Sequence, residues 1–211
     1  MASKKCRTFQ EVSLHPAVPL LLTRAILLSS RLFIMINTER LSIIIPNNSY
    51  AQAMYNYIQS NKKHFKSCSP EGVFNLTIKD WEARLTNYLQ EFESKQALRL
   101  ILTLKNQTDI VGNITIDNLI WGVFQAGYLG FRLDKKHEGK GYMFEALSAV
   151  INSVFEDQRL HRLMANYRPD NKRSEALLTR LGFAREGFAK DYLHLDGAWR
   201  DHVMMALVNS K

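Results

Sequence analysis

The stretch KKHEGKGYMFEAL, residues 135–147, places two glycines one residue apart directly before an apolar helical pattern. Glycine adopts backbone angles that other residues avoid, so Gly139 and Gly141 indicate a turn. A glycine-rich turn that opens a helix also directs several unpaired N–H groups toward one point, and this arrangement binds anions. The spacing of the glycines alone leaves both interpretations open.

Phosphate-binding patterns narrow the second interpretation. A dinucleotide-binding fingerprint requires a third glycine three residues after Gly141, where the chain has Phe144. A Walker loop requires Gly-Lys-Ser/Thr, whereas Lys140 is followed by a glycine. A shorter turn remains reasonable, with the N–H groups of residues 137–142 converging on a pyrophosphate, because the positive end of a helix dipole favours anions. The lysines of this stretch would add positive charge there, or they form a solvated basic turn.

Strands and helices alternate from Leu41 onward. Apolar runs predict strands at residues 41–45, 97–105, 110–118, 125–133 and 161–167. Apolar residues at helical spacing predict helices at residues 47–61, 79–95 and 142–157, and a short helix within 171–183. Asp196-Gly197 divides two further strands, 185–195 and 198–208, and is typical of a hairpin turn. The glycine pair therefore lies between a strand and a helix, where an anion-binding turn belongs.

Composition indicates one globular domain. The chain has 211 residues, of which 46% are hydrophobic and 23% charged. Half of its net charge of +8 falls in residues 1–34, which hold five basic residues and one acidic residue. The remaining surface does not favour sequence-specific nucleic-acid binding, although it suits a partly anionic partner. The two cysteines are too few for a disulfide framework or a thiolate metal site, so we expect a cytoplasmic protein without a metal.

Residues 1–34 differ from the rest of the chain. Their apolar stretch is interrupted by Arg24 and Arg31 and falls short of the roughly 20 residues that span a bilayer, so we expect no membrane partner. A targeting peptide is an alternative, but no typical cleavage site follows the apolar stretch. An ordered local element is a second alternative. We expect a disordered extension or a misassigned start at residues 1–34, and a single functional domain at residues 35–211 that begins at Met35.

Several ordered motifs give the chain a family resemblance. They are GKGYMFEAL (139–147), HRLMANYRPDNKRS (161–174), LLTRLGFAREGFAKDYL (177–193) and DGAWRDHVMMAL (196–207). The sequence resembles the GNAT-fold acetyltransferases, and among them the RimJ/RimL ribosomal-protein N-acetyltransferases, especially the RimJ type that acts on alanine. The resemblance covers about residues 38–208. In this family acetyl-coenzyme A binds a Gln/Arg-x-x-Gly-x-Gly/Ala loop, and the first position is Lys136 here.

The resemblance implies a fold and a set of cofactor contacts. The fold is α/β (α+β), with helices on both faces of a mixed, mostly antiparallel sheet that is splayed between its fourth and fifth strands, here 125–133 and 161–167. Acetyl-coenzyme A would enter the split, and the acceptor amine would approach from the other side. The implied contacts are the backbone of Phe131, Arg132 and Leu133; the pyrophosphate loop Lys136, Glu138, Gly139, Lys140, Gly141, Tyr142 and Met143; and the polar residues Asn166, Asn171 and Ser174. The polar residues could instead serve as ordinary strand-end and cap hydrogen-bonding groups.

The same resemblance implies direct acetyl transfer. A neutral amine attacks the thioester, backbone N–H groups stabilise the oxyanion, and an acid protonates the departing thiolate. Many relatives carry that acid as a tyrosine where this chain has Leu178, so Ser174 is the substitute that we expect. Glu186, Asp191 and His194 are candidates for the general base, or they are ordinary surface residues. An α-amine titrates near pH 7.7–8.0 and needs only weak assistance from a base.

The implied function is acetylation of the N-terminal alanine of a small-subunit ribosomal protein. The implied partners are that N-terminus and the ribosome or its precursor. Two alternatives remain at this stage: a ribosome-binding or assembly factor with the same fold, and an acetyltransferase for small-molecule amines. The acceptor loops at residues 64–76 and 120–124 carry no sequence pattern that distinguishes these functions.

Overall fold

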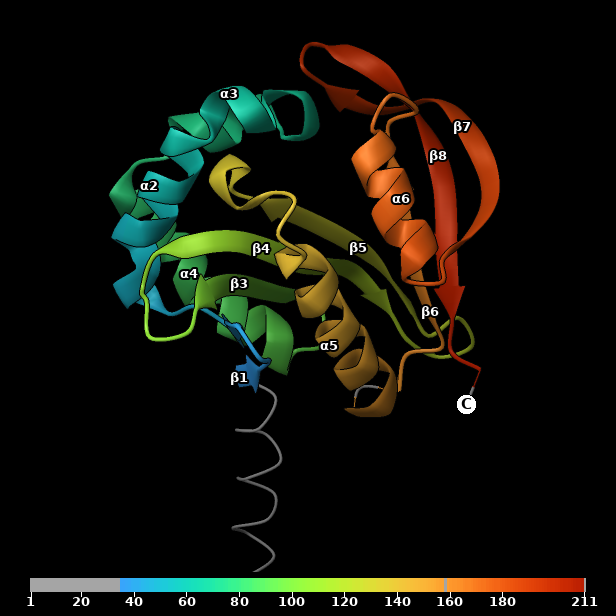
Figure 1. Cartoon of the computed structure of the whole chain (residues 1–211), viewed down its shortest axis with the longest axis horizontal. Helices are drawn as coiled ribbons and strands as arrows, with labels where there is room; N and C mark the ends of the chain where they lie inside the picture. Colours follow the sequence, from blue (N-terminus) through green and yellow to red (C-terminus); the bar gives the residue numbers. More distant parts are fainter. Residues whose placement is uncertain (1–34, 158, 211) are drawn as a thin grey trace, which may run out of the picture.

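The computed structural model describes residues 35–157 and 159–210, which form an eight-stranded sheet covered by helices (Figure 1). The strands are β1 (Met35–Asn37), β2 (Leu41–Ile44), β3 (Leu98–Leu104), β4 (Ile110–Ile120), β5 (Ala126–Leu133), β6 (Arg162–Tyr167), β7 (Ala184–Leu195) and β8 (Ala198–Val208). Their order across the sheet is β1-β2-β3-β4-β5-β6-β8-β7. Every neighbouring pair is antiparallel except β5 and β6, which are parallel. The predicted mixed, mostly antiparallel sheet is therefore confirmed.

Helices pack on both faces of the sheet, as predicted. The α-helices are α2 (Ala51–Ser60), α3 (Lys62–Phe65), α4 (Ile78–Glu93), α5 (Tyr142–Asp157) and α6 (Lys172–Arg180). Short 3-10 turns are η1 (Asn48–Tyr50), η2 (Lys66–Cys68), η3 (Glu71–Asn75) and η4 (Lys135–His137). The apolar stripe of α5 and Leu178 of α6 join the larger core on one face, and α2 and α4 form a second core with Ile101 and Ile110. None of the helices in the described parts of the chain is long and apolar enough to cross a membrane.

Local sequence signals place most of these elements. The helix predicted at 142–157 has these bounds in the structure. The helix predicted at 79–95 is α4, which begins earlier because Thr77 and Asp80 form a reciprocal capping box at its start. Asp196 and Gly197 both have a positive φ, which the hairpin between β7 and β8 requires.

One strand was not predicted. Met35–Asn37 forms β1, an edge strand in which Met35 pairs with Ile44 of β2. The strands predicted as fourth and fifth, residues 125–133 and 161–167, are therefore β5 and β6 in the structure. The predictions for residues 1–34, a disordered extension or a misassigned start, concern residues outside the described part of the chain.

We propose that a chain beginning at Met35 folds and binds coenzyme A like the full chain. It retains the pairing of β1 with β2, so its melting temperature should stay within about 3 °C of that of the full chain. Thermal unfolding and a titration with coenzyme A would measure this. A chain beginning at Leu41 is the control, because it lacks β1 and should lose both stability and affinity. A large loss already on starting at Met35 would contradict the proposal.

Candidate active site

The strands β5 and β6 separate along their length. Their parallel pairing covers only Ala126–Tyr128 and Arg162–Met164, and both strands continue beyond it. The rest of β5 still pairs with β4, and the rest of β6 with β8, so the sheet opens between β5 and β6. Figure 1 shows the two strands diverging toward the end where α6 begins.

Backbone groups of β5 face this opening at alternate residues. The C=O group of Gln125 accepts hydrogen bonds from the start of β6, whereas that of Arg132 accepts one from the Tyr57 hydroxyl at 3.2 Å. Successive residues of a strand direct their backbone groups to opposite edges, so Phe131 and Leu133 face the opening. Arg132 faces β4 instead. The prediction of a backbone contact from Arg132 is therefore corrected, because its C=O group is directed away from the opening.

The glycine turn lies at the open end and presents unpaired donors. Gly139 and Gly141 have φ values of +75° and +80°. Within the described parts of the chain, the N–H groups of residues 139–144 have no hydrogen-bond acceptor. Those of His137 and Glu138 donate three residues back, inside the η4 turn. The unpaired donors therefore begin at Gly139 and not at residue 137, because η4 uses the earlier ones.

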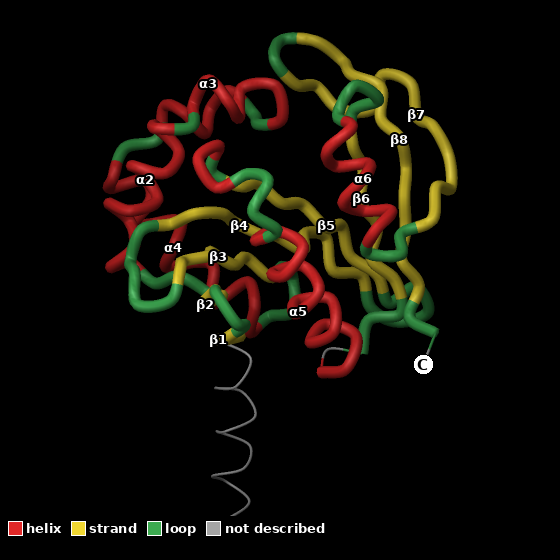
Figure 2. Tube along the Cα trace, in the orientation of Figure 1, coloured by secondary structure: helices red, strands yellow, loops and turns green. Residues whose placement is uncertain are grey.

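Glu138 joins the glycine turn to a helix on each side of the opening. One carboxylate oxygen lies 3.2 Å from His64 Nε2 on α3, and the other contacts Arg173 Nη1 in the first turn of α6. Figure 2 shows α3, the loop before α5 and the start of α6 around the open end. The exposed side chains of Lys136 and Lys140 add positive charge to this region. Its electrostatic character therefore favours an anion held by backbone groups and flanked by cations.

The polar residues predicted around a pantetheine lie on β6 and at the start of α6. The amide nitrogen of Asn166 donates to the Tyr192 hydroxyl at 3.2 Å, while its buried amide oxygen has no partner among the described residues. The Asn171 side chain caps α6 by accepting from the N–H of Ser174 at 3.1 Å. The Ser174 hydroxyl forms no hydrogen bond with a described residue. Asn166 and Ser174 therefore keep free polar groups, whereas Asn171 acts as a helix cap.

Comparison with known proteins identifies the family. The model of the acetyltransferase (GNAT) domain matches residues 40–184, which is more than half of the chain. The chain belongs to the GNAT acetyltransferase family. It is an acetyl-coenzyme A-dependent N-acetyltransferase, as the sequence motifs predicted.

Individual relatives place the acetyltransferase near the RimJ/RimL group, which confirms the predicted resemblance. The ribosomal protein uS5 alanine N-acetyltransferase of Escherichia coli (strain K12) is 40% identical over 176 residues, covering 82% of this chain and 90% of that protein. The crystal structure of ribosomal-protein-S5-alanine acetyltransferase from Vibrio fischeri has a TM-score of 0.79 at 32% identity, covering 84% of this chain and 98% of that one. Mycobacterium smegmatis RimJ in complex with CoA-disulfide has a TM-score of 0.74 at 26% identity, covering 80% of this chain and 81% of that one.

The candidates for the general base of the acetyltransferase lie on β7. Glu186 contacts Arg162, which pairs with Ala126 where β5 and β6 are still joined. The pairing of β7 with β8 and of β8 with β6 places Glu186 between the rows of Ala165 and Asn166, just beyond the joined part of β5 and β6, so its role as a base stays a prediction. Asp191 and His194 are exposed on the outer hairpin, and neither forms a hydrogen bond or ion pair with Ser174 among the described residues. Among the described residues, no group of His, Cys, Asp or Glu side chains could hold a metal ion.

The sequence analysis missed a pair of tyrosines beside Asn166. Burial, followed by the neighbouring Tyr128 hydroxyl, raises the pKa of Tyr192, so this group keeps its proton at neutral pH. Leu129 and Leu163 belong to the core that contains α5, so the alternation of side chains places Tyr128 and Asn166 on the opposite face. That face is the one from which an acceptor amine would approach. The period-two pattern of β5 could have revealed Tyr128, but its proximity to Tyr192 depends on strand order.

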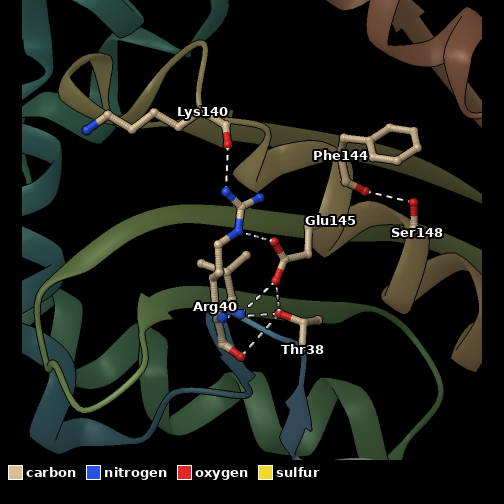
Figure 3. Close-up of polar contacts among 7 residues, drawn as sticks. Thr38, Arg40, Lys140, Phe144, Glu145 and Ser148 are labelled. Atoms are coloured by element: carbon tan, nitrogen blue, oxygen red, sulfur yellow. Dashed lines mark hydrogen bonds and ion pairs between the residues drawn. The ribbon is translucent and has the colours of Figure 1, made fainter.

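A second omission is Arg40, which lies in the turn between β1 and β2. Its Nη1 donates to the C=O group of Lys140, in the glycine turn, at 2.9 Å (Figure 3). The two residues are 100 positions apart in the chain. No spacing rule connects them, because the contact is created by the packing of β2 beside α5.

Proposed function

We propose that this acetyltransferase transfers an acetyl group from acetyl-coenzyme A to the N-terminal α-amine of a small-subunit ribosomal protein, with alanine as the acceptor residue. The observation that carries the proposal is the 40% identity to the uS5 alanine enzyme over 90% of its length. A ribosomal substrate also favours the cytoplasm as the location. We keep the ribosome or its precursor as a further partner of the same proposal.

The geometry of the chain fits coenzyme A. The unpaired N–H groups at the start of α5 suit a diphosphate, because a helix N-terminus combines free donors with a favourable dipole. Backbone groups of Phe131 and Leu133, together with the buried amide oxygen of Asn166, suit the amides of a pantetheine. This bound cosubstrate would supply an activated thioester between β5 and β6. The proposed diphosphate-binding set consists of Lys136 and residues 139–143, which include Lys140.

The remaining chemistry needs little from the chain. The acceptor nitrogen forms a bond to the acetyl carbon while the carbon–sulfur bond breaks, the amine loses one proton to solvent, and the sulfur gains one. We assign delivery of that last proton to the Ser174 hydroxyl, directly or through water, and the hydroxyl regains a proton from the solvent that took up the proton of the amine. Because an α-amine has a pKa of about 7.7–8.0, an appreciable fraction is neutral at pH 7, and a strong base is not required.

Intact-mass analysis of ribosomal proteins tests the proposal. Small-subunit proteins from cells that lack this enzyme would be incubated with the full chain and acetyl-coenzyme A. We expect one protein to gain one acetyl group, and fragmentation should place it on an N-terminal alanine. Acetylation only of small amines would contradict the proposed substrate. An unmodified set of proteins, despite measurable binding of coenzyme A, would favour an assembly factor.

Ser174→Ala is expected to lower kcat at least about tenfold with little change in the affinity for acetyl-coenzyme A. The lost interaction belongs mainly to the transition state, in which the thiolate departs. Steady-state kinetics and a binding titration would separate these two effects. Ser153→Ala is the matched control, because Ser153 lies on α5 and its hydroxyl bonds Asp157 alone among the described residues, at 2.6 Å. An unchanged kcat in Ser174→Ala would remove Ser174 from the mechanism.

A further inference from the structure

We propose that Arg40 is a positioning residue for coenzyme A binding. It holds the peptide unit between Lys140 and Gly141 in the orientation that directs the N–H group of Gly141 toward the diphosphate. The inference rests on the proposed binding of coenzyme A at the glycine turn. It adds a residue that lies outside every loop motif of the sequence and acts through the backbone of the turn.

The contact between Arg40 and the turn is direct. Arg40 Nη1 donates to the C=O group of Lys140 at 2.9 Å, and the guanidinium carbon lies 4.6 Å from the centroid of the Tyr142 ring. Figure 3 shows the Lys140 carbonyl directed at the guanidinium group. Among the described residues, the only other bond to the backbone of residues 139–141 comes from the N–H of Glu145, which donates to Gly141 at 3.1 Å. Within the described part of the chain, Arg40 therefore supplies the side-chain bond to the backbone of residues 139–141.

The contact on the Lys140 carbonyl also determines the direction of the Gly141 N–H group. A trans peptide is planar, so the C=O group of Lys140 and the N–H group of Gly141 point in opposite directions. With the carbonyl held by Arg40, the N–H group faces away from Arg40. Rotation of this unit changes ψ of Lys140 and φ of Gly141, and because glycine tolerates both signs of φ, the rotation would meet little steric resistance on the Gly141 side. A rotated peptide would present a carbonyl oxygen to the diphosphate and repel it.

Arg40 is itself held in place by Glu145 and Thr38. Its backbone N–H and its Nε donate to the two carboxylate oxygens of Glu145 at 2.9 and 2.6 Å (Figure 3). The Thr38 hydroxyl donates to the same carboxylate at 2.5 Å. The next residue, Leu41, is fully buried in the core. The guanidinium group is thus fixed both to β2 and to the first turn of α5, the two elements that frame the glycine turn.

The carboxylate that holds Arg40 is ionised at neutral pH. Burial raises the pKa of Glu145, but the hydrogen bonds from Thr38 and Arg40 outweigh it and leave the pKa below its usual value. The contribution of this cluster is therefore complete above the ordinary carboxyl pKa of about 4.3, and is lost as the pH falls through the lowered pKa of Glu145. Binding experiments near pH 7 examine the intact cluster.

The variant Arg40→Lys distinguishes orientation of the peptide unit from simple charge attraction of coenzyme A. A lysine keeps the positive charge near the ligand, but a single ammonium group does not reproduce the planar fork that contacts Glu145 and the Lys140 carbonyl together. If charge alone mattered, Arg40→Lys would bind coenzyme A like the native chain. If orientation of the peptide matters, Arg40→Lys and Arg40→Ala should both bind it weakly.

Calorimetric titration with coenzyme A tests the proposal on the full chain. We expect both Arg40 variants to lose about tenfold or more in affinity, which corresponds to one hydrogen bond to a charged group. The matched control is Arg99→Ala. Arg99 also pairs with carboxylates, Glu91 at 2.5 Å and Asp117 at 2.7 Å, and lies over a tyrosine ring, but it is on β3 and its carboxylate partners are on α4 and β4. The Arg99→Ala variant should bind coenzyme A with the native affinity.

Two further readouts separate a local from a general effect. Acetyl transfer from S-acetylpantetheine, which has no diphosphate, should be unchanged in Arg40→Lys. The amide NMR signals of Gly139 and Gly141 in the protein alone should shift or broaden in both Arg40 variants and stay in place in Arg99→Ala. Native affinity in Arg40→Lys, or an equal loss with S-acetylpantetheine, would overturn the role of Arg40. If the native chain bound no coenzyme A, the proposed function itself would fail, and this inference with it.

Discussion

Gly141→Val is expected to weaken coenzyme A binding about a hundredfold or more, while the melting temperature falls by only a few degrees. Gly141 has a φ of +80°, which a β-branched residue rarely adopts, so valine would force the turn into another conformation. The turn is exposed and carries no core residue, so this change costs little of the free energy of unfolding. It does displace several N–H groups at once, and each bond to a charged phosphate contributes about 1.5–3 kcal/mol.

Calorimetry beside thermal unfolding measures both effects of Gly141→Val. Gly122→Val is a close control, because Gly122 has a φ of +79° in an exposed turn between β4 and β5, and its added side chain would meet no atom within 4 Å. It should lose a similar amount of stability and keep its affinity for coenzyme A. Similar losses of affinity in the two variants would indicate that the glycines serve the fold and not the ligand.

A peptide with a free N-terminal alanine is expected to be acetylated, and the same peptide with a blocked N-terminus to be inert. The attacking amine must be neutral, and at pH 7 the neutral fraction of an α-amine exceeds that of a lysine roughly 300-fold. The rate should therefore rise with pH and level off above about pH 8. Lowered pKa values keep Glu145 and Asp170 ionised throughout this range, while a raised pKa keeps Tyr192 protonated near neutrality. We therefore expect the rise in rate with pH to reflect deprotonation of the acceptor amine.

Mass spectrometry of both peptides over a series of pH values provides the measurement. A third peptide with N-methylated lysines and a free alanine is the control, and it should react like the first. Acetylation of lysine in the blocked peptide at a comparable rate would contradict N-terminal specificity, although the chain would still be an acetyltransferase. A flat pH profile would show that proton loss from the amine does not limit the rate.

Local sequence determined much of this protein. The helix at residues 142–157 follows from apolar spacing, the hairpin between β7 and β8 from Asp196-Gly197, and the turn before α5 from the glycine pair. Each of these depends on backbone angles and side-chain period within a few residues, so a linear pattern suffices to predict it. The family resemblance added the split sheet, which such patterns alone do not reveal.

Only the tertiary structure decided which groups face the split. Arg132 was predicted as a backbone contact, but strand pairing directs its C=O group to Tyr57, away from the split, and leaves Phe131 and Leu133 facing it. Glu186 lies near the row of Asn166 only because β7 pairs with β8 and β8 pairs with β6. The physical reason is that the direction of a backbone group depends on register, and register is set by pairing between distant segments. The bond from Arg40 to Lys140 was unpredictable for the same reason, because it exists only where the packing of β2 against α5 brings residues 100 positions apart together.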